Sequence, residues 1–398
     1  MTTTSKSDPF IRNGREERIA ALADRLAARF AERAAEHDRV GSFPFENFEE
    51  MKQEGYLGLP VPKEYGGDEM SLYELVLAQE RLARGDGSTA LAVGWHMGIV
   101  LNERYAHAWP ERLFASFCGD VVNRGAMINS FASERATGSP SRGGRPQTEA
   151  VPVEGGWLLT GRKTFSTLSP ILQEFIVTAG VTGTEETGEF YVERGEGVRV
   201  EETWNTLGMR ATGSHDLVLE RVFVPEAHVL SITVGGKRPP RKETGDGWLL
   251  HIPACYLGIA YAARRHALRF ALSYRPNSLP GPIAELPSIR QHIAAMEEEF
   301  TVARAYLYAA ADRWDREPEA RAAMKPELGL AKKLATNAAL SVVDKAMRIV
   351  GGSSLSRTAP LERLYRDVRA GLHNPPMDDT VMKLLADRAL DEAGREDN

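Results

Sequence analysis

Two short stretches in the middle of the chain combine small, hydroxylated and aromatic residues in a way that suits a flat ligand. The stretch FASERATGS, residues 131–139, places serines and a glycine where the backbone can approach a ligand closely. The stretch KTFSTLS, residues 163–169, sets Phe165 between hydroxyl-bearing residues, so its ring can stack on a planar group while hydroxyls bond the edge of that group. Either stretch alone is more often a plain strand and turn, so residue types by themselves predict no more than a planar-ligand site.

A second place with reactive side chains is the corner LYRDVRAGLHNPPMDD, residues 364–379. A helical pattern runs through Leu364 and Arg369 and then meets a His, an Asn and two prolines, which cannot continue a helix. Asp378 and Asp379 follow and suit the N-cap of a last helix. The corner thus gathers an imidazole and two carboxylates, groups that either serve acid–base chemistry or only shape the turn.

Other kinds of site find no support in the sequence. The two cysteines, Cys118 and Cys255, form neither a metal-binding box nor a disulfide framework, so no metal site is expected. No GxGxxG follows a strand and no GxxxxGK[ST] occurs. The run Ser214-His215-Asp216 does not make a hydrolase relay, because adjacent residues of a strand point to opposite faces.

The composition is that of an ordinary globular protein, with 42% apolar and 26% charged residues in 398. A formal charge of −6 argues against a general nucleic-acid binder. The N-terminal MTTTSKSDPF lacks the apolar run of a signal peptide, and no stretch has the length of a membrane span. We therefore expect a cytoplasmic protein with no membrane and no nucleic-acid partner.

The elements that position these residues change in character twice along the chain. The first third is helical: Ile19, Leu22, Leu26 and Phe30 recur every three or four positions and give one buried face. A second helical pattern starts at Ser71, a suitable N-cap with a glutamate three residues later. From about 125 to 230, short β-rich segments between glycines predict a small antiparallel sheet or barrel.

After an exposed connector at 231–247, the pattern becomes helical again. Long helices are expected over 251–275, 283–314 and 325–350, and a last one from Asp378 or Asp379. The predicted class is α+β, with a helical domain at 1–122, a β domain at 123–232 and a helical bundle at 233–398.

Five segments together resemble the acyl-CoA dehydrogenase superfamily of flavoproteins, in the family's own order and spacing. The likeness implies an N-terminal α-helical domain, a middle β-barrel domain and a C-terminal four-helix bundle, usually in a homotetramer. The segments are FPFENFEEMKQEGYLGLPVPKEYGG (43–67), FASERATGS (131–139), LTGRKTFST (159–167), LGMRATGSHDLVLERVFVP (207–225) and IVGGSSLSRTAPLERLYRDVRAG (349–371).

The resemblance also implies a flavin between the β domain and the bundle. Phe165 and Thr167 match the aromatic and the hydroxyl that flank its ring, and most dehydrogenases carry Trp at the first of these positions. The loop that lines flavin and substrate corresponds to Phe131, Ser133, Gly138 and Ser139.

The residues expected at the adenine end of the cofactor match the family's pattern less well. Arg275 resembles the arginine of an Arg-x-x-Phe-Gly segment that usually reaches the FAD phosphates across a subunit interface, but RPNSL lacks the Phe-Gly. Gly351 and Gly352 match the family's glycine pair, which here follows Arg348 where a glutamine is usual. FAD is the expected cofactor, and FMN is conceivable.

In the family's dehydrogenases, a glutamate removes the α-proton of an acyl thioester while hydride leaves for the flavin. That position falls at Pro375 or Pro376 here, and the alternative family position falls near Trp248. Since none of these residues accepts a proton, α,β-dehydrogenation of an acyl thioester would need a displaced base such as Asp378 or Asp379. It would also need an electron-transfer partner.

Two other functions stay open from the sequence. Reduced-flavin monooxygenases share the fold, and two of their segments resemble Gly94-Trp95-His96 and Leu372-His373-Asn374-Pro375. This likeness implies oxygenation of a small organic substrate through a flavin hydroperoxide, with His96 and His373 near the oxygen and a separate flavin reductase. The missing glutamate also permits a non-catalytic binding protein, although the retained flavin-lining residues argue against it.

Overall fold

Five α-helices form the first part of the computed structural model, which describes residues 8–137, 144–234 and 242–396. Asn13 caps the first of them by accepting hydrogen bonds from the backbone N–H groups of Arg15 and Glu16. The predicted cap at Ser71 is confirmed as a full capping box with Glu74. The helices are α1 (Gly14–Val40), α2 (Phe45–Gln53), α3 (Leu72–Ala83), α4 (Gly87–Ala106) and α5 (Glu111–Arg124).

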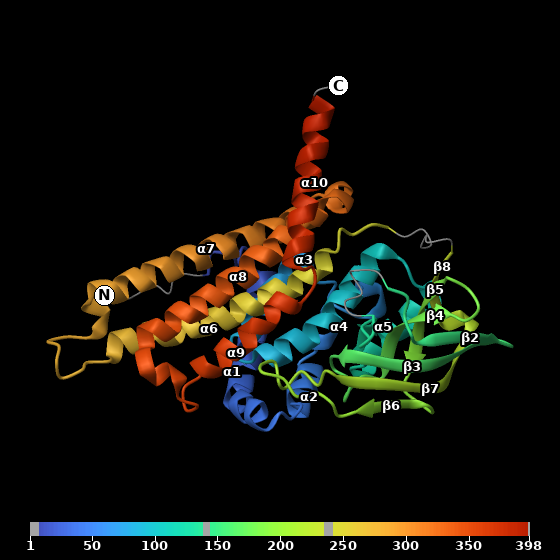
Figure 1. Ribbon diagram of the computed structural model, residues 1–398, viewed down its shortest axis with the longest axis horizontal. Helices are drawn as coiled ribbons and strands as arrows, with labels where there is room; N and C mark the ends of the chain where they lie inside the picture. Colours follow the sequence, from blue (N-terminus) through green and yellow to red (C-terminus); the bar gives the residue numbers. More distant parts are fainter. Residues whose placement is uncertain (1–7, 138–143, 235–241, 397–398) are drawn as a thin grey trace.

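The middle part is one sheet of eight strands, which Figure 1 shows at one end of the molecule. The antiparallel sheet that we expected is in fact mixed, because β1 and β2 each pair in parallel with β4. Neither pair is joined by a tight hairpin, so no turn forces the strands to run in opposite directions. The strands are β1 (Ile128–Phe131), β2 (Glu149–Val153), β3 (Gly156–Ser166), β4 (Glu174–Val181), β5 (Thr187–Glu193), β6 (Val198–Glu201), β7 (His215–Pro225) and β8 (Val229–Thr233).

The last part is a bundle in which α8 packs against both α6 and α7, and α3 packs against α6. The helix predicted over 325–350 has those bounds, whereas the one predicted from residue 283 begins at Pro287 after a 3-10 turn. Figure 1 shows α10 standing away from the body of the protein. The helices are α6 (His251–Ser273), α7 (Pro287–Arg316), α8 (Lys325–Val350), α9 (Leu361–Val368) and α10 (Asp378–Glu396).

The sheet and the bundle meet where the loop 207–213 lies against α9. A Cβ on Gly208 would lie 2.3 Å from the carbonyl oxygen of Arg366, so only glycine allows this approach. The next backbone N–H, that of Met209, donates a 2.7 Å hydrogen bond to the carboxylate of Asp367. The β domain is thus fixed to the C-terminal bundle by a buried side chain.

Candidate functional site

Phe165 is the most exposed aromatic ring of the sheet, with 66% of its surface accessible. It lies at the end of β3, beside an irregularity in the pairing with β7, and its φ of 56° is a left-handed value that bulky residues rarely adopt. The ring meets that of Trp204 in an edge-on arrangement, at a centroid distance of 5.8 Å. A strained and exposed aromatic residue contributes little to folding, and such strain gathers at functional sites. Its geometry fits a ring that stacks on a planar cofactor.

Thr167 follows Phe165 and is nearly buried, at 9% exposure. Its hydroxyl lies 2.8 Å from that of Ser214, which lies 2.7 Å from the hydroxyl of Thr212. The Thr167 carbonyl accepts a 3.0 Å hydrogen bond from the side-chain amide of Asn129. The loop after β3 is therefore held from both sides, and Thr167 has a fixed place beside the exposed ring.

The neighbouring loop after β1 carries the other predicted flavin-lining residues. Ser133 is half-buried, and its carbonyl accepts a 2.9 Å hydrogen bond from Thr164 N–H, so this loop runs beside β3. Phe131 is buried against Phe175, with ring centroids 5.8 Å apart. Gly138 and Ser139 lie outside the described residues.

Arg275, Gly351 and Gly352 lie apart from this group. Arg275 follows α6 and the two glycines follow α8, and all three are exposed. Figure 1 shows these helix ends at the side of the bundle that is remote from the sheet. One chain does not bring these residues to the flavin that Phe165 and Thr167 would contact.

His96 lies on α4 in the core of the protein and is fully buried. Its Nδ1 accepts a 3.3 Å hydrogen bond from Ile128 N–H, so Nε2 carries the proton and donates to the Leu57 carbonyl at 3.2 Å. Burial lowers the pKa of His96 to about 4, with the bond to Leu57 acting in the opposite direction. The ring is neutral at physiological pH, and both of its nitrogens bond to main chain.

The C-terminal corner separates the two groups that the sequence predicted there. His373 is exposed at the end of a 3-10 turn, Arg369–His373. Asp378 opens α10, and its carboxylate lies 3.5 Å from Lys332 Nζ and accepts a 2.8 Å hydrogen bond from Asn337. Between them, Asn374 is anchored through its side-chain oxygen by the hydroxyl of Tyr256. The corner therefore presents His373 to solvent and turns Asp378 toward α8.

An aromatic cluster beside Trp248 was not predicted. Trp248 and Trp95 are half-buried and flank His251, with centroid distances of 6.0 and 4.9 Å. His251 donates from Nδ1 to the Trp248 carbonyl at 2.9 Å, while its buried Nε2 has no hydrogen-bond partner among the described residues. The sequence feature that could have revealed this cluster is the pair of glycines Gly94 and Gly98. A Cβ at either position would lie within 3 Å of the cluster or of Gln79. Glycines four apart on one helix face can indicate such close packing.

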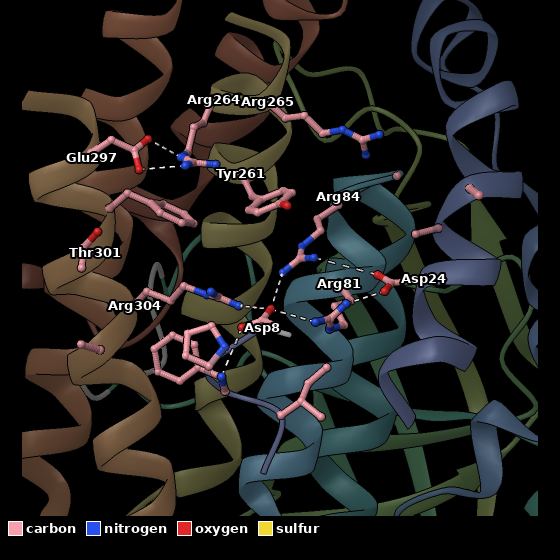
Figure 2. Close-up of a pocket in the computed structure, with 18 of the residues that line it drawn as sticks. Asp8, Asp24, Arg81, Arg84, Tyr261, Arg264, Arg265, Glu297, Thr301 and Arg304 are labelled. Carbon is pink, nitrogen blue, oxygen red and sulfur yellow. Dashed lines mark hydrogen bonds and ion pairs between the residues drawn. The ribbon is translucent and has the colours of Figure 1, made fainter. Parts of the chain in front are cut away.

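A separate cavity of about 1030 Å³ lies between α1, α3, α6 and α7, and none of the predicted site residues lines it. Figure 2 shows four of its arginines, Arg81, Arg84, Arg264 and Arg304, directed at acidic partners. Asp8 lies between Arg81 and Arg304, each at 2.8 Å, and Arg264 pairs with Glu297. Since these charges compensate one another, we assign no ligand to this cavity. Across the described residues there is also no cluster of metal-binding side chains, and no helix has the length and apolar character to cross a bilayer.

Comparison with known proteins fits this arrangement. Models of the acyl-CoA dehydrogenase N-terminal, middle and C-terminal domains match residues 14–111, 130–222 and 250–372. The Bacillus subtilis protein named "Putative acyl-CoA dehydrogenase YdbM" is 48% identical over 96% of this chain and 99% of its own. The L-evernosamine nitrososynthase of a Micromonospora species is 30% identical over 89% of this chain and 84% of its own.

Among solved structures, KijD3 in complex with FMN and dTDP-3-amino-2,3,6-trideoxy-4-keto-3-methyl-D-glucose is similar with a TM-score of 0.82. It is 27% identical and covers 95% of this chain and 94% of its own. These likenesses confirm the predicted three-part fold and the flavin cofactor, and they set aside the non-catalytic alternative. The chain belongs to the acyl-CoA dehydrogenase family and is a flavin-dependent oxidoreductase.

Proposed function

We propose that this protein is an oxygenase that uses reduced flavin and molecular oxygen on a small organic substrate. One observation carries the proposal: neither family position for the catalytic base holds a carboxylate, since the first falls at Pro375 or Pro376 and the second near Trp248. Removal of an α-proton needs an acceptor within hydrogen-bond reach of the carbon, and no proline or indole supplies one. The flavin itself supplies the electrons and the reaction with oxygen, and the protein binds and orients.

The surroundings of Asp378 support the same conclusion. A displaced base must turn its carboxylate toward the flavin, whereas Asp378 binds Lys332 and Asn337 of α8. Lys332 is only 1% exposed, so its charge depends on this partner. Moving Asp378 to a substrate would leave a buried ammonium group without a counter-charge.

Of the two histidines suggested for oxygen chemistry, His373 is the better placed. Both nitrogens of His96 already bond to main chain in the core, whereas His373 is exposed at the corner beside Pro375. We propose that His373 donates a hydrogen bond at the substrate side and that His96 is structural. A His373→Ala variant that still forms one product per oxygen consumed would argue against this role.

The relatives bear on the cofactor and on the substrate class. The KijD3 complex contains FMN and a dTDP-linked amino sugar, and the sequence around Arg275 and Arg348 departs from the pattern for the adenine end of FAD. Both points support FMN as the alternative to FAD. At the second base position, the indole ring of Trp248 meets that of Trp95 with centroids 5.9 Å apart.

A second candidate is acyl-thioester dehydrogenation, which the 48% identical relative favours by its name. Dehydrogenation would pass electrons to an electron-transfer partner, and oxygenation would draw them from a flavin reductase.

We also propose that a second copy, in a homotetramer, brings Arg275, Gly351 and Gly352 to the flavin of its neighbour. The mass of the flavin-loaded protein in solution tests the assembly, and Arg275→Ala should weaken flavin binding without changing that mass.

The deciding experiment compares two reactions of the flavin-loaded protein. Anaerobic titration with butyryl-, octanoyl- and isovaleryl-CoA should leave the visible flavin band unchanged. When reduced flavin on the protein is mixed with oxygen, the visible absorbance of oxidised flavin should recover in two kinetic phases. Free reduced flavin should not show these two phases. Stoichiometric bleaching by any of the thioesters would overturn the oxygenase proposal in favour of dehydrogenation.

A further inference from the structure

Asn374 stands at the C-terminal corner, directly between His373 and Pro375, and its side chain is anchored from the core. Its carbonyl oxygen Oδ1 accepts a hydrogen bond from the hydroxyl of Tyr256, which lies on α6. Tyr256 is fully buried, and its ring packs so closely on Gly371 that a Cβ there would lie 3.1 Å from two ring carbons. The hydroxyl therefore reaches the corner from a ring that is fixed in the core.

The direction of this hydrogen bond follows from the burial of Tyr256. Burial raises the pKa of Tyr256 well above its usual value of 10, so the hydroxyl keeps its hydrogen at physiological pH. No other group in the described part of the chain accepts that hydrogen. If the amide of Asn374 turned over, its NH2 group would donate to Tyr256, and a buried hydroxyl hydrogen would be left unpaired, which is costly. Tyr256 therefore donates, and the carbonyl of Asn374 faces it.

The NH2 group of Asn374 consequently points to the side away from Tyr256. Across the described residues no group accepts a hydrogen bond from this NH2 group. Asn374 is half-buried and His373 beside it is exposed, so the amide lies near the surface of the corner. Since an amide NH2 group only donates, the corner carries a hydrogen-bond donor of fixed direction.

We propose that Asn374 is a specificity-determining residue that binds an acceptor oxygen of the substrate, and that Tyr256 positions it. The inference rests on the proposed function, in which the substrate lies at this corner. A dehydrogenase would supply a carboxylate here, which takes a proton from its substrate. An amide NH2 group has the opposite polarity, so it attracts a carbonyl, ether or hydroxyl oxygen and disfavours a group that can only donate.

The test uses two bicyclic probes of similar size and shape, 1-indanone and indole. The first carries only an acceptor oxygen, and the second carries only an N–H donor. NMR titration of the flavin-loaded protein measures both dissociation constants, and selectivity is the constant for indole divided by that for 1-indanone. Wild-type protein should prefer 1-indanone by about five- to tenfold.

The pH dependence of this selectivity distinguishes an amide donor from an imidazole donor. An amide does not titrate between pH 6 and pH 9, and the raised pKa of Tyr256 keeps its hydroxyl protonated over that range. The selectivity should therefore be constant from pH 6 to pH 9. A selectivity that disappears as the pH rises would assign the donor to a titrating group and would overturn the role of Asn374.

Asn374→Asp keeps the shape and the bond to Tyr256, but it replaces the NH2 group by an acceptor oxygen. Its selectivity should reverse in favour of indole, at least about tenfold below the wild-type value. Asn374→Ala removes the donor, and Tyr256→Phe frees the amide to turn, so each should bring the selectivity close to one. Adding Tyr256→Phe to Asn374→Ala should cause no further change, because Tyr256 acts through Asn374.

Tyr73→Phe is the matched control for Tyr256→Phe. Tyr73 is also buried, at 3% exposure, but its hydroxyl donates to the Phe10 carbonyl at 2.9 Å, outside the corner. This variant should keep the wild-type selectivity. Unchanged selectivity in Tyr256→Phe as well would overturn the positioning role of Tyr256.

The outcomes for the inference and for the proposed function differ. Equal selectivity in wild type and Asn374→Asp, or a preference of the wild type for indole, overturns the inference and leaves the oxygenase proposal intact. Absence of binding of both probes to the wild type overturns the corner as the place of such a substrate. Bleaching of the flavin by a thioester overturns the proposed function, whatever the selectivity.

Discussion

Lys332 Nζ lies 3.5 Å from a carboxylate oxygen of Asp378, where the first turn of α10 meets α8. Lys332 is 1% exposed and Asp378 about one third exposed, so the aspartate shields a charge that water cannot reach. Burial lowers the pKa of Lys332, and Asp378 acts in the opposite direction. The carboxylate that the sequence offered as a base thus pairs with a buried lysine of α8.

Asp378→Asn should lower the free energy of unfolding by about 1–2 kcal/mol, because Lys332 loses the counter-charge that offsets its burial. Turnover should stay near the wild-type value. Urea denaturation and steady-state assays measure the two effects, and Asp387→Asn, at an exposed carboxylate of the same helix, is the control. Loss of turnover at unchanged stability would instead identify Asp378 as the base.

Phe165→Asn should separate cofactor binding from folding. Asparagine tolerates the left-handed backbone that costs phenylalanine about 1 kcal/mol or more, and the exposed ring packs against little. The flavin-free variant should therefore be as stable as the wild type or more stable, while flavin affinity falls at least tenfold. Phe223→Ala, at another exposed ring of the sheet, should change neither quantity. Equal flavin affinity in Phe165→Asn would contradict the stacking role.

Stability should fall between about pH 4 and pH 7 because of Asp367. Burial raises the pKa of Asp367 from 3.8 to about 7, against the opposing effect of Arg363. In that window the folded state binds more protons than the unfolded state, so the free energy of unfolding decreases as pH rises, and it levels off above the folded pKa. Asp367→Asn keeps an oxygen for Met209 N–H and should flatten this part of the profile.

Urea denaturation at pH 5, 6, 7 and 8 measures the profile. Glu174, whose pKa burial also raises to about 7, contributes with the same sign. Glu174→Gln should therefore remove a second part of the slope independently. Parallel profiles of wild type and Asp367→Asn would refute the assignment.

Arg84 and Arg304, which line the cavity in Figure 2, belong to a buried ion network that should be sensitive to one carboxylate. Glu80 is fully buried and accepts hydrogen bonds from Arg84 at 2.6 Å and from Arg304 and Tyr308 at 2.8 Å. Glu80→Gln should cost about 3–5 kcal/mol of stability, because two arginines lose their shared charge partner. Asp344→Asn breaks an exposed pair with Arg348 and should cost no more than about 0.5 kcal/mol. Similar losses of stability in Glu80→Gln and Asp344→Asn would show that burial does not increase the contribution of the ion network to stability.

Much of the fold was predictable from local sequence patterns, because helix capping and helix formation depend on residues that are close together in the chain. The capping box at Ser71 and the helix over 325–350 involve residues within one turn or one periodic face. The parallel pairings of β4 were missed because they join segments that no hairpin connects. Pairing direction there depends on how the whole sheet assembles.

The residue types of the candidate site stand out in the sequence, but the contacts between them do not. Phe165 and Thr167 stand out in the sequence, but the partners Ser214 and Thr212 lie more than 40 residues away. His96 and Asp378 have side chains suited to catalysis, and the groups that bind them, Leu57, Ile128 and Lys332, lie far from them in the chain. A single sequence does not show which long-range partner neutralises or holds a reactive side chain.

The Met209 carbonyl accepts a hydrogen bond from the Thr212 hydroxyl, and the Met209 N–H donates one to Asp367 of α9. Thr212 is joined through the Ser214 hydroxyl to Thr167, which lies beside the exposed ring of Phe165. A single residue therefore links α9 to the end of β3. A displacement of α9 can reach the exposed ring through Met209, so the joint between sheet and bundle is also a mechanical connection between them.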